Sequence, residues 1–247
     1  MTKNLFSVEG KIVVLTGSGG LLGQQFRQAF EENGATVVDF DLKSEIPVDI
    51  TDENSVENAV QAALAAHGRI DVLIHCAAMD APPGGNRVQF APYEEFSVEL
   101  WEKEIRVNLT GSFIVTRQVA PHMMRQRSGS VIFISSDLGM IAPNNTIYET
   151  GNFKDIAYVS SKSGILGLMR SWASYLSPHG VRVNALVPGG VFNNQNEEFV
   201  KKNVKLNMMG RMARKDEYNG AVLFLASEAS SYMTGASMVV DGGRTAW

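Results

Sequence analysis

The sequence has a single cysteine, no cluster of basic residues and no long hydrophobic run, and each shortage excludes a class of protein. Cys76 is alone among 247 residues, so an intrachain disulfide is impossible and we expect a reducing, cytoplasmic setting. The formal net charge is -4 at pH 7 and Lys and Arg are scattered, so neither nucleic acid nor an anionic membrane is an expected partner. No stretch approaches the roughly 18 apolar residues of a membrane-spanning helix, and residues 1–11 contain no signal-peptide core.

Metal-binding patterns are equally scarce. The four histidines, at positions 67, 75, 122 and 179, show no metal-ligand spacing, so no metal is expected. What remains is an ordinary globular composition, with 45% hydrophobic and 19% charged residues. This length and composition suit one α/β domain with a substantial core. No repeat or linker divides residues 1–247.

Short apolar runs recur at wide intervals, and most are continuous rather than alternating, which is typical of strands buried on both faces of a parallel sheet. These runs lie at 11–16, 36–40, 71–76, 130–135, 181–187 and 237–241. Helices are expected between them at 22–33, 54–66, 98–126, 157–176 and 217–226. The third helix should break near Asn108 and kink at Pro121. The alternation predicts a doubly wound, mostly parallel α/β sheet with helices on both faces.

A glycine-rich turn, "TGSGGLLG" at 16–23, follows the first apolar run and opens the first expected helix. A dinucleotide pyrophosphate needs backbone N–H groups at a helix N-terminus, and side chains would block its approach. Asp41 ends the second strand region, where an acid can bind the adenosine ribose hydroxyls and repel a 2′-phosphate. No Arg follows Asp41 and the glycine loop has no basic residue, so NAD(H) is favoured over NADP(H). A solvated acid at a strand end is the alternative reading of Asp41.

The stretch "YVSSK" places Tyr158 and Lys162 four residues apart on one helical face. An ammonium about 4 Å from a phenol stabilises its ionised form by up to ~4 kcal/mol at an effective dielectric near 20. That effect lowers the phenol pKa by up to roughly 3 units and brings it towards acid–base range. Tyr148 has no lysine at this spacing. A chance pairing of Tyr and Lys is the alternative, because such pairs occur on many helices.

Together these residues resemble the short-chain dehydrogenase/reductase family along nearly the whole chain. The matching pieces are "TGSGGLLG", Asp41, "VDIT" (48–51), "VNLTG" (107–111), "IFISSDLG" (132–139), "YVSSK", "VRVNALVPGG" (181–190) and "LFLASEASSYMTGASMVVDGG" (223–243). The resemblance implies that Tyr158 is the catalytic acid/base and Lys162 its partner, which also binds the nicotinamide ribose. It further implies that Ser136 polarises the substrate oxygen and that Asn108 holds a water in a proton relay.

The resemblance also implies a single Rossmann-type domain, with the dinucleotide-binding half at about 1–140 and substrate-side elements at about 79–93, 136–158 and 188–215. Asp49 resembles the adenine contact, and the "PGG" turn with Val191 resembles the clamp on the nicotinamide carboxamide. The full set of expected cofactor contacts is Gly17, Ser18, Gly20, Leu21, Leu22, Gly23, Asp41, Asp49, Ile50, Ala77, Ala78, Tyr158, Lys162, Pro188, Gly189 and Val191.

The chain departs from the family pattern in three places. Leu21 stands where the short branch of the family has its middle glycine. The stretch "HCAA" (75–78) replaces the usual Asn-Asn-Ala-Gly, and we interpret His75 as a hydrogen-bonding core residue rather than a catalytic one. Finally, Ser136 and Tyr158 are further apart than is usual, because of the polar segment "NNTIYETGNFKD" (144–155).

The 144–155 segment is either a passive surface insertion or a substrate lid, and its position between two catalytic residues favours the lid. The insert, "PGGVFNNQNEEFVKK" (188–202) and "DGGRTAW" (241–247) resemble the flagellin-modification protein A branch of the family, which is associated with bacterial surface-glycan sugars. The polar character of the insert and of "NNQNEE" (193–198) favours a sugar-like substrate. Candidate substrate contacts are Asp137, Tyr148, Glu149, Asn193 and Asn194.

Three functions therefore compete. The leading one is an NAD-dependent oxidoreductase that moves a hydride between the nicotinamide cofactor and a sugar-like secondary alcohol or ketone. A ketoacyl-type reductase is the second, and a catalytically silent NAD-binding regulatory or scaffold protein is the third. The resemblance also implies a homotetramer or homodimer built on the helices that hold Asn108 and Tyr158. The small residues Ser161, Gly164 and Gly167 would allow close helix approach there, or would serve packing within the chain.

Overall fold

Within residues 4–81 and 87–247, which the computed structural model describes, six parallel strands form one sheet in the order β2-β1-β3-β4-β5-β6. Every neighbouring pair of strands is parallel. The strands are β1 (Ile12–Thr16), β2 (Thr36–Phe40), β3 (Val72–His75), β4 (Gly129–Ile134), β5 (Val181–Pro188) and β6 (Ser237–Val240). The predicted doubly wound sheet is confirmed. Its direction of winding reverses between β1 and β3, the place where open α/β sheets bind ligands.

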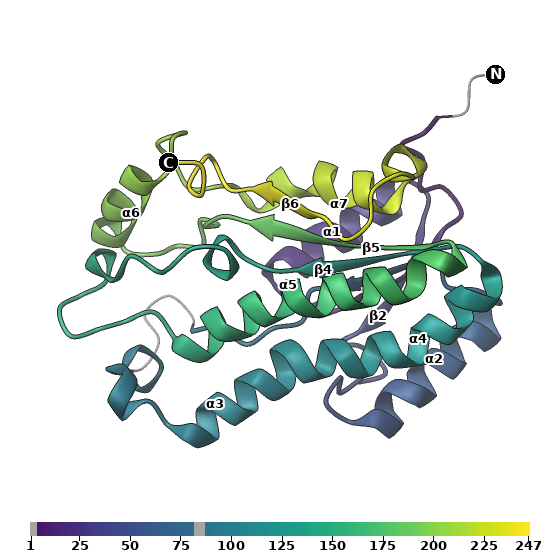
Figure 1. Ribbon diagram of the computed structural model, residues 1–247, viewed down its shortest axis with the longest axis horizontal. Helices are drawn as coiled ribbons and strands as arrows, with labels where there is room; N and C mark the ends of the chain where they lie inside the picture. Colours follow the sequence, from purple (N-terminus) through teal and green to yellow (C-terminus); the bar gives the residue numbers. More distant parts are fainter. Residues whose placement is uncertain (1–3, 82–86) are drawn as a thin grey trace.

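Helices cover both faces of this sheet, with α3, α4 and α5 on one side and α1 and α7 on the other (Figure 1). Their bounds are α1 (Leu21–Glu32), α2 (Glu53–His67), α3 (Val98–Ile105), α4 (Ser112–Gln126), α5 (Ile156–Leu176), α6 (Glu197–Asn203) and α7 (Asn219–Ala226). The short α6 was not predicted. Among the described residues, no helix combines the length and hydropathy needed to cross a membrane.

Strand β1 shows why the apolar runs are continuous. Val14 packs into the core beneath α4 and α5, whereas its neighbours Val13 and Leu15 pack into the core beneath α1 and α7. All three side chains are fully buried, and each such burial stabilises the fold by about 1.5 to 3 kcal/mol. A strand with helices on both faces therefore needs apolar residues at successive positions.

The expected break in the third helix is present. Helix α3 ends at Ile105, a π-helical segment covers Arg106–Gly111, and α4 begins at Ser112. Pro121 lies inside α4. Single-turn π-helical segments are frequent at functional sites, and this one carries Asn108.

Candidate active site

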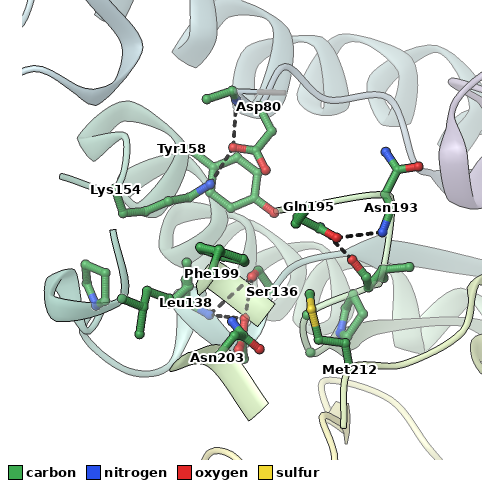
Figure 2. Close-up of a pocket in the computed structure, with 18 of the residues that line it drawn as sticks. Asp80, Ser136, Leu138, Lys154, Tyr158, Asn193, Gln195, Phe199, Asn203 and Met212 are labelled. Atoms are coloured by element: carbon green, nitrogen blue, oxygen red, sulfur yellow. Dashed lines mark hydrogen bonds and ion pairs between the residues drawn. The ribbon is translucent and has the colours of Figure 1, made fainter. Parts of the chain in front are cut away.

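A cavity of about 710 Å³ opens at the carboxyl ends of β3, β4 and β5. Figure 2 shows side chains that line it. Residues that follow these strands line it, and so do α5, the 144–155 insert and the segment around α6. The predicted substrate-side elements 136–158 and 188–215 therefore meet at one place. The loop 79–93, predicted as a site rim, contributes Asp80, Ala81 and Phe90, while its residues 82–86 lie outside the described part of the chain.

Three of the predicted catalytic residues line this cavity. Ser136 lies just beyond β4, and its hydroxyl donates to Oδ1 of Asp137 at 2.8 Å. Tyr158 and Lys162 come from α5. The Lys162 ammonium donates to the backbone oxygen of Ile134 at 2.8 Å, and burial lowers the pKa of Lys162 to about 8. The buried Lys162 is therefore held at the end of β4, beside the serine.

The first turn of α5 fixes the catalytic tyrosine. Asp155 is the N-cap residue, and its Oδ1 accepts hydrogen bonds from the backbone N–H groups of Ala157 at 2.9 Å and Tyr158 at 3.0 Å. Such caps stabilise helix termini by about 1 kcal/mol. The last residue of the insert thus sets where α5 begins and where Tyr158 stands.

That Lys162 lowers the Tyr158 pKa stays a prediction, and the structure adds a second cation that lies closer to the phenol ring. Burial and the nearby Asp80 carboxylate raise the pKa of Tyr158, and the cation that opposes them is Lys154. The Lys154 Nζ atom lies 4.2 Å from the centre of the Tyr158 ring, against 5.6 Å for Lys162 Nζ. Lys154, a lysine of the insert, is therefore nearer to the ring centre than Lys162.

Asn108 is buried, and its side chain clamps the segment that follows β3. Its Oδ1 accepts from the Met79 N–H at 2.7 Å, and its Nδ2 donates to the Met79 carbonyl at 3.0 Å and to the Ser161 hydroxyl at 3.1 Å. Its backbone carbonyl accepts from the Ser112 hydroxyl at 3.2 Å. The described contacts of the amide are thus anchoring contacts, and the water-holding role remains a prediction.

The glycine loop forms a cradle that side chains would fill. Gly17 has a φ of +69°, and a Cβ there would lie 2.5 Å from the Ala77 Cα atom. A Cβ on Gly23 would lie 2.0 Å from the Gly17 carbonyl oxygen. Gly20 is the N-cap residue of α1 and supplies no side chain to its free N–H groups. Exposed N–H groups at a helix N-terminus fit a dinucleotide pyrophosphate. Leu21 and Leu22 line the main cavity beside them.

A second hollow of about 260 Å³ lies next to this loop, lined by Ser18 and Asp41 among others. Oδ2 of Asp41 accepts from the Gly19 N–H at 3.0 Å, so the acid borders the glycine loop as predicted. Two basic residues that the argument from the glycine loop and the absence of a following Arg left out, Arg27 and Lys43, line the same hollow.

Arg27 is already paired within the chain. Its Nη1 lies 2.7 Å from Asp39 Oδ2, and its Nε lies 2.9 Å from Glu31 Oε1. Helix α1 brings Arg27 to the hollow from another segment, which the short-range sequence argument did not consider. The Asp39 and Glu31 carboxylates neutralise the Arg27 guanidinium. Arg27 would therefore attract a 2′-phosphate less strongly than an unpaired arginine would.

The remaining predicted cofactor contacts fall into two groups. Ala78, Pro188, Gly189 and Val191 line the main cavity. By contrast, Asp49, Ile50 and Ala77 line neither hollow. Asp49 Oδ1 accepts from the Thr51 N–H and hydroxyl at 2.8 Å each, Ile50 is buried in the core, and the Ala77 N–H donates to the Thr16 hydroxyl at 3.2 Å. Asp49 thus stabilises the turn before α2; the contact of Asp49 with adenine and the contact of Ile50 with the cofactor remain predictions.

Four of the five candidate substrate residues line the main cavity: Asp137, Tyr148, Glu149 and Asn193. Asn194 does not. It is exposed and has a φ of +59°, a left-handed conformation that Asn tolerates better than most residues. We therefore assign Asn194 to the turn before α6, which the polarity of the "NNQNEE" stretch concealed.

The sequence suggested that the 144–155 insert is polar. In the structure the insert lines the cavity, but it also has apolar contacts. Ile147 is buried, and the Tyr148 ring lies between Phe90 and Phe199, with ring centres 5.8 Å and 5.6 Å away. These three rings form an aromatic wall that joins the insert to α6. The polar residues of the insert that line the cavity are Asn144, Tyr148, Glu149, Asn152 and Lys154.

Several cavity residues were not named individually by the sequence reasoning: Asp80, Lys154, Gln195, Phe199, Asn203, Met212 and Arg244. All of them except Arg244 lie in the predicted substrate-side ranges, and Gln195 belongs to the polar stretch 193–198. Lys154 ends a segment already singled out, and Arg244 belongs to the C-terminal stretch used for the narrower resemblance. His75 has the predicted structural role: it is buried, its Nε2 lies 2.8 Å from the Thr116 hydroxyl, and burial lowers its pKa to about 3.

This fold and site define a dehydrogenase of the Rossmann type: a glycine cradle at the sheet's switch point, and a Ser, Tyr and Lys set at the adjoining cavity. Comparison with known proteins gives the family. A family model described as "Enoyl-(Acyl carrier protein) reductase" matches residues 3–245. The chain is 31% identical to the 3-oxoacyl-(acyl-carrier-protein) reductase FabG of Thermotoga maritima, over 96% of this chain and 98% of that protein. The chain belongs to the short-chain dehydrogenase/reductase family.

Solved structures agree with this assignment. A gluconate 5-dehydrogenase from Burkholderia cenocepacia, in complex with NADP and tartrate, has a TM-score of 0.88 at 26% identity and covers 99% of this chain and 98% of its own. A short chain dehydrogenase from Leptospira borgpetersenii with bound NAD+ has a TM-score of 0.88 at 27% identity, covering 99% and 97%. The protein is an oxidoreductase that transfers a hydride between a nicotinamide cofactor and an alcohol or ketone.

Proposed function

We propose that the protein uses NAD(H) and acts on a polyhydroxylated, sugar-like secondary alcohol or ketone. The observation that carries the proposal is the polar lining of the cavity around Ser136 and Tyr158, which comes from the insert and from the segment around α6. The side-chain amides and carboxylates in this lining belong to Asn144, Glu149, Asn152, Asn193, Gln195, Asn196, Glu198 and Asn203.

The catalytic roles follow from position. Bound cofactor supplies or accepts the hydride. In oxidation, the Tyr158 phenolate takes the hydroxyl proton as the hydride leaves the carbinol carbon; in reduction, the phenol returns a proton to the carbonyl oxygen. Ser136 donates a hydrogen bond to the same oxygen, where charge develops. Lys162 would bind the nicotinamide ribose, while Asn108 anchors the Met79 backbone beside the site.

The cofactor proposal rests on Asp41 at the glycine loop. Its carboxylate accepts from Gly19 N–H at 3.0 Å and from Lys43 N–H at 2.8 Å, which leaves acceptor capacity for ribose hydroxyls. A 2′-phosphate at this position would face a carboxylate. Arg27 offers little compensation, because Asp39 and Glu31 already pair with it. We therefore favour NAD(H), although the gluconate dehydrogenase neighbour binds NADP.

The lining of the cavity supports a sugar-like substrate over a long acyl chain. Its aromatic wall, formed by Phe90, Tyr148 and Phe199, supplies apolar contact to the carbon face of a ring. Its amides and carboxylates supply partners for hydroxyl groups, which is the usual division of labour in a ligand pocket. Most of these amides and carboxylates are partly or fully exposed, and a hydroxylated ligand would offer them hydrogen-bond partners that an acyl chain lacks.

A ketoacyl-type reductase is the second candidate, favoured by the 31% identity to FabG. The two functions make different demands on the same cavity. The acyl substrate needs an apolar channel leading from Ser136 and Tyr158, whereas the insert contributes mostly polar residues to the lining of the cavity.

The deciding experiment is a turnover screen at neutral pH with NAD(H) and NADP(H). The substrates are polyols, sugar acids, free and nucleotide-linked sugars, and ketoacyl thioesters. We expect turnover of a hydroxylated substrate with NAD(H). Efficient reduction of ketoacyl thioesters, with none on any sugar derivative, would replace the proposal by the second candidate. Shortening the 144–155 insert should abolish kcat/KM for the sugar while leaving NADH binding intact.

We further propose a cytoplasmic homodimer or homotetramer that assembles through α4 and α5. Phe113, Trp172 and Tyr175 form a ring cluster across these helices, and Phe113 and Tyr175 are exposed. Ser161 and Gly164 pack within the chain, against Asn108 and Leu109 respectively. A Cβ on Gly167 would meet nothing within 4 Å, so this part of α5 is open to a second copy. Sedimentation of wild type and Tyr175→Glu tests the assembly.

A further inference from the structure

Lys154 lies outside the predicted catalytic set, yet its Nζ atom is nearer to the centre of the Tyr158 ring than the Nζ atom of Lys162 is. It is the next-to-last residue of the insert, lines the cavity, and is only 7% exposed. Its backbone N–H donates to Asn145 Oδ1 at 2.9 Å, which ties the two ends of the insert together. Its ammonium lies 4.2 Å from the Tyr158 ring centre, within the range of a cation–π contact.

A second group fixes the position of this ammonium. Lys154 Nζ makes an ion pair and hydrogen bond with Asp80 Oδ1, and Figure 2 shows the Lys154 side chain beside the Tyr158 ring, directed to Asp80. Asp80 follows Met79, whose backbone N–H and carbonyl are both held by Asn108. The Lys154–Asp80 ion pair thus joins the insert to the segment that follows β3. Asn108 of the π-helical segment holds that following segment in place.

We propose that Lys154 is a positioning residue for catalysis, which favours the ionised form of Tyr158, and that Asp80 opposes it as the other half of a tuning ion pair. This inference rests on the proposed acid/base role of Tyr158. Opposite charges near a phenol push its protonation equilibrium in opposite directions. Because both members are held by the fold, the balance between them sets how readily Tyr158 gives up its proton.

Other groups also face this site and belong to the same balance. Lys162 Nζ lies 5.6 Å from the Tyr158 ring, and Ser136 and Asp137 act on the phenol from the end of β4. Around Lys154, the further titratable groups are Tyr148, Glu104 and Lys162. These neighbours are common to all the variants below, so each substitution changes one charge against a constant background.

The proposed tuning by Lys154 and Asp80 predicts opposite shifts of the Tyr158 pKa, which a purely structural role of the ion pair would not produce. Lys154→Met should raise the Tyr158 pKa, because the cation is lost, whereas Asp80→Asn should lower it, because the anion is lost. Lys154→Arg should stay near wild type. Lys154→Met and Asp80→Asn should each shift the Tyr158 pKa by about one unit. At pH values below that pKa, such a shift changes the ionised fraction of Tyr158 about tenfold. Lys202→Met is the matched control, since Lys202 also lines the cavity but pairs with Glu198 at 2.8 Å.

The first measurement is an NMR titration of isotope-labelled tyrosine in the full chain saturated with NAD+, with Tyr158 assigned through Tyr158→Phe. The onset of ionisation should come first in Asp80→Asn, then in wild type and last in Lys154→Met. The second is the pH dependence of kcat for alcohol oxidation, where the rising limb should move in the same order. The inference would be overturned if the Tyr158 pKa were the same as in wild type in Lys154→Met and Asp80→Asn, or if it moved in the same direction in both. That holds even if both variants lose activity.

The outcome is separate from that of the proposed function. If Tyr158→Phe keeps its turnover, the acid/base assignment is wrong, whatever the titration shows. If Tyr158→Phe is inactive but Lys154→Met changes only KM for the substrate, Lys154 is a substrate contact and the tuning role is wrong. Asp80→Asn preserves size and shape, and Lys154→Arg preserves the positive charge, so they keep the test usable should Lys154→Met fold poorly.

Discussion

Arg244 Nε lies 2.9 Å from Asp137 Oδ2, and both side chains are almost completely buried. The other oxygen of Asp137 accepts the Ser136 hydroxyl at 2.8 Å. The C-terminal stretch is therefore linked through one carboxylate to the serine that we expect to polarise the substrate oxygen. Burial raises the pKa of Asp137, and Arg244 opposes that rise.

We predict that Arg244→Met lowers the free energy of unfolding by about 3 to 5 kcal/mol at neutral pH, because it leaves a buried carboxylate without its cation. Loss of Arg244 raises the Asp137 pKa further, so the deficit should be small at low pH, where Asp137 is protonated, and should grow as pH rises through that pKa. Urea unfolding at several pH values measures it. Adding Asp137→Asn should restore part of the stability.

The matched control for this prediction is Arg214→Met. Arg214 pairs with Asp216 at 3.1 Å on the surface, with both side chains more than half exposed, and such pairs contribute about 0 to 1 kcal/mol. An Arg244→Met loss as small as that of Arg214→Met would contradict the buried link.

The second prediction separates the two cavity tyrosines. Tyr158→Phe should remove nearly all turnover, a loss of at least about a hundredfold expected for an acid/base group, while NADH binding is retained. Tyr148→Phe should keep kcat and at most raise KM, because Tyr148 belongs to the aromatic wall. Steady-state kinetics and NADH fluorescence titration provide the two readouts. Wild-type kcat in Tyr158→Phe would refute the assignment.

The third prediction concerns the cofactor. The protein should prefer NAD(H) over NADP(H) by at least about tenfold in kcat/KM, which needs only ~1.4 kcal/mol. Asp41→Ala should narrow that preference, because it removes the ribose acceptor and leaves Arg27 and Lys43 in the hollow. The control Asp39→Asn should keep the kcat/KM for NAD(H), since the Asp39 carboxylate is directed to Arg27. Equal use of both cofactors by wild type would reject the interpretation of Asp41.

The sheet was predictable because its signal is local. Each strand is an apolar run bounded by polar or glycine residues, and the predicted bounds of β2 and the observed Thr36–Phe40 coincide. Tyr158, Lys162 and Ser136 were found for a similar reason, since their motifs are contiguous in the sequence. Helix α6 was missed because seven residues are too few for a periodic pattern.

The charges of the site could not be read from the sequence in the same way. Lys154 meets Asp80 across 74 positions, and Arg244, near the C-terminus, meets Asp137 in the middle of the chain. Arg27 reaches the Asp41 hollow only because α1 packs beside β2. Such pairings depend on the three-dimensional arrangement of segments that the sequence gives no local reason to connect, and they decide the electrostatics of Tyr158 and of the cofactor hollow.

The last prediction concerns a buried acid that the catalytic roles do not use. Glu104 of α3 is 0% exposed. Among the described residues, no hydrogen bond satisfies either of its carboxyl oxygens or Oδ2 of Asp155. Two ionised carboxylates cannot donate to each other, but a proton on Glu104 would supply a hydrogen bond to Asp155. Consistent with this, burial and then Asp155 raise the pKa of Glu104 to about 8.

The sign of the resulting pH dependence follows from the raised pKa. Between the unfolded value near 4.5 and the folded value of about 8, the folded chain binds the extra proton, so its stability should fall as pH rises through this window. Glu104→Gln keeps the shape and a permanent donor to Asp155. We expect it to flatten this dependence and to be more stable than wild type at alkaline pH by about 1 to 3 kcal/mol. Urea midpoints at acidic, neutral and alkaline pH test it, with the exposed Glu102→Gln on the same helix as the control. Parallel pH curves for wild type and Glu104→Gln would show that Glu104 is ionised in the folded protein.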